Sequence, residues 1–241
     1  MMKEKKHVFN QTQAVILYLI VTVAFQMAGM KINGLFYGSE DISLYVDKGS
    51  KILGVILILE MILLIRFTPM KISWSAVKGN KDELKKSLPI SAAISLLIIL
   101  GLIGFRLYMN SKNPIYKEIP MFGLYLKLHM RWLYPFSIVF QELFIKAFTQ
   151  DNIRTLIEEA GDGPSKKNEK KTVLLTSLVT AMFFFTLHVQ YPLYYMTGAF
   201  VLCFVTGIIY EKDRNIWGAV MVHFALGFLP RCFGVLQIIE G

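Results

Sequence analysis

WLYPFSIVFQELFIKAFTQ, residues 132–150, is an apolar run with charged side chains inside it. It is mostly apolar and long enough to cross a bilayer, yet Glu142 and Lys146 lie inside it. An ionisable side chain at mid-bilayer costs at least ~2.5–3.5 kcal/mol unless it faces the protein interior. Because the two residues are four apart, with the acid first, a helix would place them on one face where they can neutralise each other. The stretch therefore predicts a membrane helix with its polar face turned inward.

The composition supports an integral membrane protein. Hydrophobic residues make up 54% of the 241-residue chain, which is outside the range of ordinary soluble domains. The net charge of +9 comes from lysines and arginines that gather between the apolar runs, where they meet anionic membrane lipid. This placement argues against nucleic acid as a partner.

The apolar runs predict an all-α, polytopic bundle of transmembrane helices. Seven runs have the character of membrane spans, although the second is short: residues 14–30, 52–67, 88–105, 132–150, 173–189, 193–210 and 216–235. Residues 106–131, which contain Pro114 and Pro120, resemble an interfacial amphipathic helix more than a span. An eighth span hidden there is the alternative.

We divide the chain into residues 1–131, which hold the N-terminal helices and the interfacial segment, and residues 132–241, which hold the polar motifs. Basic residues are more numerous on the side of the N-terminus, so that terminus is expected inside a multi-pass cell membrane, of the bacterial cytoplasmic kind. Glu60 is expected to face a neighbouring helix, and Cys203 and Cys232 to be buried without a disulfide.

Three predicted spans each carry a polar centre. Gln141 and Glu142 lie on the fourth span, His188 closes the fifth and His223 lies within the seventh. A carboxylate and two imidazoles in a cavity of low dielectric can activate a water molecule and stabilise an oxyanion, which is the chemistry of peptide hydrolysis. The same three groups also form a possible zinc set, but we favour a site without a cofactor.

The order and spacing of these residues resemble the CPBP family, the CAAX protease and bacteriocin-processing family of intramembrane proteins, also called Abi. That family has Glu-Glu-x-x-x-Arg, then Phe-x-x-x-His, then His-x-x-x-Asn. Here the first motif reads QELFIK at residues 141–146, the second runs from Phe184 to His188, and the third runs from His223 to Gly227. The resemblance covers roughly residues 132–227 and implies an intramembrane endopeptidase site that acts on a peptide or protein.

Three positions depart from the family pattern. The resemblance assigns the general base to the first glutamate, where Gln141 has an amide that can orient water but cannot take its proton. Lys146 keeps the charge of the family arginine without its planar fork. Gly227 replaces an asparagine, and the loss of such an oxyanion donor commonly costs ~2.7–4 kcal/mol of transition-state stabilisation.

Two functions follow, and the sequence leaves open whether the chain is an enzyme. The first is an endopeptidase in which Glu142, His188 and His223 hydrolyse a peptide bond. The alternative is an inactive pseudoprotease that binds a peptide or protein partner in bacteriocin immunity or membrane signalling. A transporter has less support, because no inverted repeat is apparent.

Overall fold

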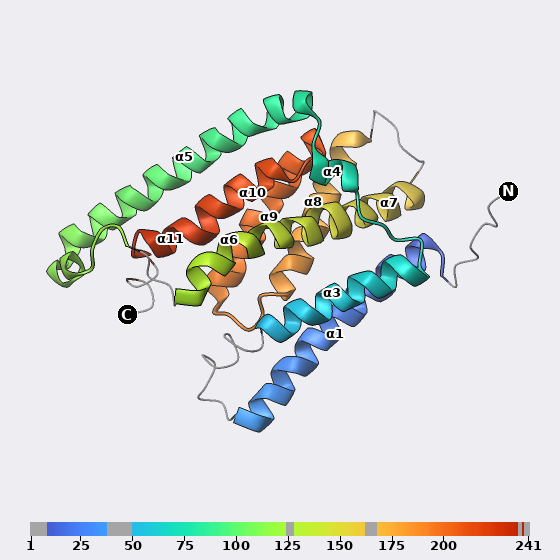
Figure 1. The fold of residues 1–241 in the computed structure, drawn as a ribbon, viewed down its shortest axis with the longest axis horizontal. Coiled ribbons are helices and arrows are strands. Elements are labelled where there is room, and N and C mark those ends of the chain that lie inside the picture. Colours follow the sequence, from blue (N-terminus) through green and yellow to red (C-terminus); the bar gives the residue numbers. More distant parts are fainter. Residues whose placement is uncertain (1–8, 38–49, 124–127, 162–167, 236–237, 239–241) are drawn as a thin grey trace. The chain divides into compact units, whose positions relative to one another are not determined.

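The computed structural model describes residues 9–37, 50–123, 128–161, 168–235 and 238, and these residues form helices and turns without any strand. The predicted all-α class is therefore confirmed for this part of the chain. Figure 1 shows the helices of the chain, which divides into two compact units. Unit 1 comprises Met1–Ser73 and Phe148–Phe204, and unit 2 comprises Trp74–Ala147 and Val205–Gly241.

Each predicted apolar run falls largely on helices, although residues 187–189 of the fifth run and 233–234 of the seventh form turns. The α-helices are α1 (Gln11–Tyr37), α3 (Ser50–Phe67), α4 (Trp74–Lys78), α5 (Lys81–Lys112), α6 (Leu128–Glu142), α7 (Asp151–Ala160), α8 (Glu169–Thr186), α9 (Leu193–Asp213), α10 (Trp217–His223) and α11 (Leu229–Cys232). Two π-helices continue α6 and α10: η3 (Leu143–Gln150) and η4 (Phe224–Phe228). The predicted connector at residues 38–49 and the centre of the predicted aqueous loop, 162–167, lie outside the described residues.

Three of the described helical stretches are long and apolar enough to cross a membrane: Gln11–Ala28, Leu84–Lys112 and Leu193–Asp213. They correspond to the first, third and sixth predicted spans. The other predicted spans are not among these described stretches, so the number seven stays a prediction.

The stretch after α5 turns back instead of forming an eighth span in its described part. Asn113 ends α5, and its side chain accepts a hydrogen bond from the backbone N–H of Ile115 in the short 3-10 helix η2 (Pro114–Glu118). Arg106 is fully buried and donates from Nη2 to the carbonyl oxygens of Tyr116 and Ile119. Of the predicted interfacial segment 106–131, residues 106–112 belong to α5, residues 121–123 are not helical and residues 128–131 begin α6, so its described part is not one continuous helix.

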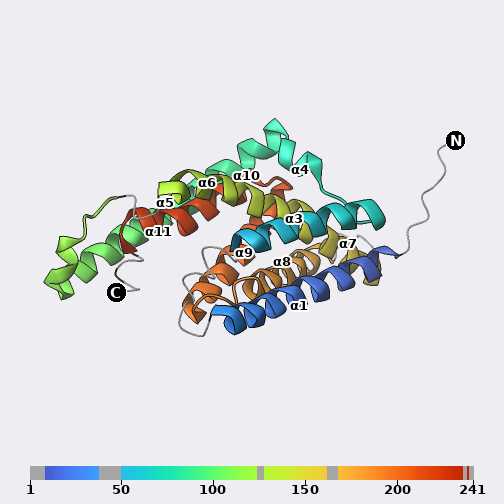
Figure 2. The same cartoon turned by 60° about the horizontal axis from the view of Figure 1, so that its bottom comes forward.

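In unit 1, α1 presents a polar face to its neighbours; Figure 2 shows α1 running beside α8 and α3. Tyr18, Thr22 and Gln26 are four residues apart and so lie on one face. The Tyr18 hydroxyl is 2.7 Å from Thr149 Oγ1, and Thr22 donates to both carboxylate oxygens of Glu60 at 2.8 and 2.9 Å. The prediction that Glu60 faces a neighbouring helix is confirmed.

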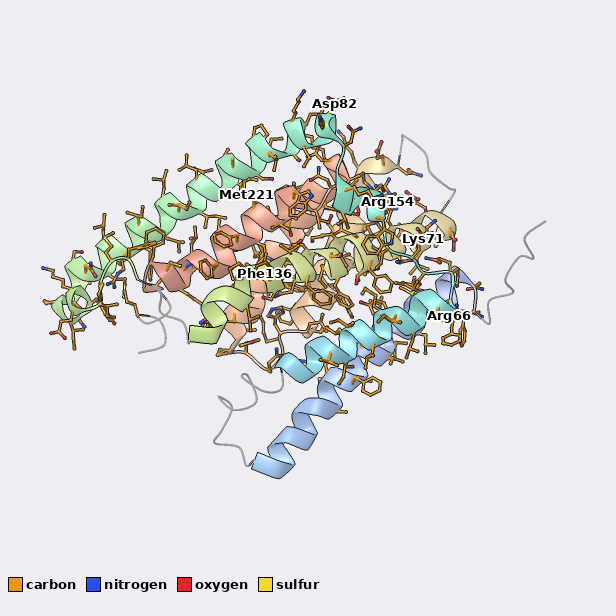
Figure 3. The ribbon with its side chains drawn as sticks, in the orientation of Figure 1. Arg66, Lys71, Asp82, Phe136, Arg154 and Met221 are labelled. Carbon is orange, nitrogen blue, oxygen red and sulfur yellow. The ribbon has the colours of Figure 1, made fainter. Side chains whose placement is uncertain are left out.

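In unit 2, α10 packs closely against α5 because the contact is lined by small residues (Figures 1 and 3). Ser95 Oγ donates to the carbonyl oxygen of Met221 at 3.4 Å, and Met221 is labelled on α10 in Figure 3. A Cβ atom on Gly218 would lie only 2.6 Å from Ser91 Oγ. Close helix approach through glycine and serine is a common way for membrane helices to associate.

We predict that Gly218→Ala destabilises the protein by about 1–3 kcal/mol, because the added methyl group overpacks the contact with Ser91. Ser91 Oγ has no hydrogen-bond partner among the described residues, so Ser91→Ala should cost little and should restore stability to the double variant. The measurement is the free energy of unfolding in detergent micelles.

The control is Gly104→Ala on α5, where the added Cβ would meet nothing within 4 Å. Alanine is the better helix former, so this variant should be neutral or gain about 0.5–1 kcal/mol. Equal stability of the Gly218→Ala and Gly104→Ala variants would contradict the packing described.

Candidate functional site

A buried acid–imidazole pair forms the centre of unit 2. Glu142 is the last residue of α6 and His223 is the last residue of α10. Glu142 Oε1 lies 2.6 Å from His223 Nδ1, and both residues are only 4% exposed. The structure therefore brings together two of the predicted site residues from sequence positions 81 apart.

Both members of the pair stand where an α-helix changes into a π-helix. Residues 143–150 follow Glu142 and residues 224–228 follow His223 in π-helical geometry, which is rare and is often found at functional sites. Pro230 explains the second change, because it offers no N–H to the carbonyl of residue 226 and its ring crowds that carbonyl. Residues 143–150 contain neither proline nor glycine, and we have no local explanation for the first change.

The hydrogen bond fixes which nitrogen of His223 carries a proton. An ionised carboxylate can only accept hydrogen bonds, so Nδ1–H donates to Glu142, and Nε2 stands outside this bond. In the neutral ring Nε2 carries a lone pair, which makes it a candidate general base. Glu142 Oε2 is buried and has no hydrogen-bond partner among the described residues.

One wall beside the pair is built by Tyr134 and Gly227. The Tyr134 hydroxyl donates to the carbonyl oxygen of Gly227 at 3.3 Å. Its ring stacks on Phe228 with the centroids 5.9 Å apart, next to the buried side chains of Ile138 and Cys232. Tyr134 is eight residues before Glu142, so the two side chains lie on the same face of α6.

His188 lies in unit 1, in the turn after α8. Its Nδ1 is 2.8 Å from the carbonyl oxygen of Phe184, and the Phe184 ring meets the imidazole edge to face at 4.4 Å between centroids. Since a carbonyl only accepts, Nδ1 carries the proton in His188 as well. The meeting of His188 with the Glu142–His223 pair stays a prediction.

The turn that carries His188 is held by α1. The Gln26 amide donates to Gln190 Oε1 at 2.6 Å and to the carbonyl oxygen of Leu187 at 3.3 Å. These bonds fix the backbone on both sides of His188. Gln26 was not among the site residues predicted from the sequence, although its spacing of four residues from Thr22 and eight from Tyr18 indicates a polar face on α1.

The two remaining residues of the first motif lie beside Glu142 in sequence but do not bond to it. Gln141 is half-buried, and its amide nitrogen lies 3.5 Å from Ser137 Oγ. Lys146 is completely buried in η3 and engages in interactions of its own. The hydrogen-bond partner of Glu142 is His223 rather than Lys146, because the π-helix begins between them and His223 comes close from α10.

Within the described part of unit 2, no group of three or more histidine, cysteine, aspartate and glutamate side chains could hold a metal ion. Cys203 and Cys232 are buried, in agreement with the prediction from the sequence, and are not joined in a disulfide. Two of the three possible zinc ligands, Glu142 and His223, therefore lie together in this unit. The third, His188, belongs to unit 1.

Residues 123–229 match the family model described as type II CAAX prenyl endopeptidase Rce1-like. The CAAX-protease resemblance is confirmed. The Rce1-like match contains all three motifs, including Glu142, His188 and His223. It supports a protease-like function in a membrane for this segment. No curated protein and no solved structure matches the chain significantly. The division at residue 131 is not tested by the match and stays a prediction.

We predict that Glu142 and His223 are strongly coupled in stability. Replacing either residue by alanine leaves a buried polar partner unsatisfied, so the second replacement should cost much less than the first. A double-mutant cycle of Glu142→Ala and His223→Ala should give a coupling free energy of about 1–3 kcal/mol in detergent unfolding.

The matched control pairs His223→Ala with Asp82→Ala. Asp82 is an exposed acid at the N-terminal end of α5 in the same unit (Figure 3). These two changes should add to within about 0.5 kcal/mol. If the Glu142 cycle were additive as well, the pair would not exist in solution.

Proposed function

We propose that the chain is an intramembrane endopeptidase of the CAAX-protease type, which hydrolyses a peptide bond in a membrane-associated peptide or protein. The observation that carries the proposal is the buried Glu142–His223 hydrogen bond inside the Rce1-like segment. The family's description names prenyl CAAX substrates, so a prenylated C-terminal peptide is the first substrate class that we propose.

In the proposed mechanism, His223 replaces the base that Gln141 cannot supply. Its Nε2 takes a proton from water while the water oxygen bonds to the scissile carbonyl carbon. The carboxylate of Glu142 stabilises the imidazolium through Nδ1–H, as the buried aspartate does in a serine-protease triad. When the C–N bond breaks, the same proton passes from Nε2 to the leaving amine nitrogen.

His188 is the second imidazole of the proposed site. The carbonyl of Phe184 fixes the proton on its Nδ1, so Nε2 of a neutral ring is an acceptor. We assign His188 to orient the attacking water by accepting its other hydrogen. This assignment depends on the convergence predicted from the three motifs.

We place this chemistry in a multi-pass protein of the cell membrane, of the bacterial cytoplasmic kind, with the N-terminus inside. Three described helical stretches of suitable length and apolarity support a membrane location. The proposal extends this to all seven apolar runs, with membrane lipid around the bundle. It includes no metal or other cofactor.

The second candidate is the pseudoprotease, and Gln141 is the residue that favours it. At this position an amide replaces the glutamate that the resemblance assigns as the general base. Such a protein would keep the peptide site and bind a peptide or protein partner without cleaving it, in bacteriocin immunity or in membrane signalling.

We predict that the purified protein in lipid vesicles cleaves a prenylated CAAX-type peptide. His223→Ala should lower kcat by about 10²–10⁴, the usual contribution of general acid–base catalysis. Gln141→Glu should raise kcat, because it adds a carboxylate that can accept a proton. The measurement is release of the C-terminal fragment, with the unprenylated peptide run in parallel.

Glu60→Gln is the matched control, because it makes a carboxylate-to-amide change at a hydrogen-bonded acid of unit 1. It should keep kcat, and a zinc chelator should leave the wild-type rate unchanged. Turnover by the wild type no greater than that of His223→Ala, together with retained peptide binding, would instead support the pseudoprotease. Loss of activity with the chelator would replace our mechanism by a metal-dependent one.

A further inference from the structure

The turn that carries His188 meets most of its hydrogen-bonding needs within itself. The last carbonyl groups of an α-helix have no partner inside the helix, and α8 ends at Thr186. The carbonyl oxygens of residues 184, 185, 186 and 188 each accept a hydrogen bond from a group three or four residues further along the chain. The carbonyl oxygen of Leu187 differs, because its donor is Gln26 of α1.

Gln26 holds this turn with both hydrogens of its amide. A carbonyl oxygen only accepts, so the atom 3.3 Å from the oxygen of Leu187 is the amide nitrogen of Gln26. The same nitrogen donates its second hydrogen to Gln190 Oε1 at 2.6 Å. Gln26 is 2% exposed, and Figure 2 shows α1 beside α8. One buried side chain therefore holds the chain one residue before His188 and two residues after it.

The orientation of the His188 ring depends on the path of this turn. Nδ1 is 2.8 Å from the carbonyl oxygen of Phe184, and the two rings meet at 4.4 Å between centroids. Both contacts are made within one turn of chain, and residues 187–190 are no longer helical. The bonds from Gln26 tie the same turn to a helix more than 160 residues away in the sequence. A shift of the turn would therefore carry the imidazole with it.

We propose that Gln26 is a positioning residue, which holds the imidazole of His188 in the orientation needed to accept a hydrogen bond from the attacking water. This inference rests on the proposed endopeptidase function, in which His188 orients that water. Gln26 acts through the backbone of the turn and touches neither the water nor the peptide. It brings α1, which precedes the Rce1-like segment of residues 123–229, into the support of the site.

The first test is Gln26→Leu in the vesicle cleavage assay. Leucine is similar in size but donates no hydrogen bond, so the turn loses its tie to α1. A misplacement of about 1 Å can cost about 10²-fold in rate, and we expect kcat to fall by about 10–10² with KM nearly unchanged. Gln13→Leu makes the same change at an exposed position of α1 and should keep kcat.

Changes at Gln190 test the direction of the hydrogen bond. Gln190→Leu should lower kcat less than Gln26→Leu does, because the carbonyl of Leu187 keeps its donor. Gln190→Glu should recover most of that loss, since a carboxylate accepts the same hydrogen bond from Gln26. Equal losses in the leucine and glutamate variants would overturn the inference.

A His188→Ala background separates positioning from a general loss of structure. If Gln26 acts through His188, Gln26→Leu should change kcat little in this background, because residues that act as a unit are not additive. A further fall as large as the fall in the wild type would overturn the inference and leave the proposed function standing.

A measurement without catalysis tests the same contact. In ¹⁵N NMR of the histidine-labelled protein in lipid, with His188→Ala for assignment, Gln26→Leu should shift or broaden the ring signals of His188. Gln13→Leu should leave them unchanged. Unchanged His188 signals in Gln26→Leu would overturn this inference at any level of activity. A wild type without turnover would overturn the proposed function, while the NMR comparison would still decide whether Gln26 holds the ring.

Discussion

The hydrogen bond of 2.6 Å between Glu142 and His223 is the interaction on which the rest of the site depends. A carboxylate buried in an apolar bundle is costly unless a partner satisfies it, and an imidazole needs an acceptor to fix its tautomer. The hydrogen bond between them satisfies the buried carboxylate and fixes the tautomer of the imidazole. In this arrangement Nδ1 of His223 carries the proton, and Glu142 Oε2 is a buried oxygen without a hydrogen-bond partner among the described residues.

The surrounding fold of unit 2 can be understood as support for this bond. The close packing of α10 on α5 at Gly218 positions the helix that ends in His223. After His223 the chain continues as the π-helix η4, which ends just before Pro230, and Gly227 within η4 lies against the imidazole. Tyr134 fills the space beside that glycine. Stability in this unit and chemistry at the site therefore depend on the same contacts.

The helical class, the positions of the apolar runs and the importance of Glu142 and His223 could be predicted from the sequence, because apolar length and charge inside a span carry clear free-energy costs. The partner of Glu142 could not, since the rule for residues four apart assumes an unbroken α-helix and a π-helix follows Glu142. Gln26 was missed because its partners lie more than 160 residues away in the sequence, in a turn that no sequence pattern links to α1. The approach of His188 stays a prediction, since the structure describes it in the other unit.

The most direct test is to observe the protons on the ring of His223. The chain has four histidines, so ¹⁵N-labelled histidine and a His223→Asn comparison would assign its two ring nitrogens by NMR in lipid or detergent. We predict a protonated Nδ1 in a strong hydrogen bond, and loss of that bond in Glu142→Ala. A bare Nδ1 with the proton on Nε2, or an Nδ1 signal that Glu142→Ala leaves unchanged, would contradict it.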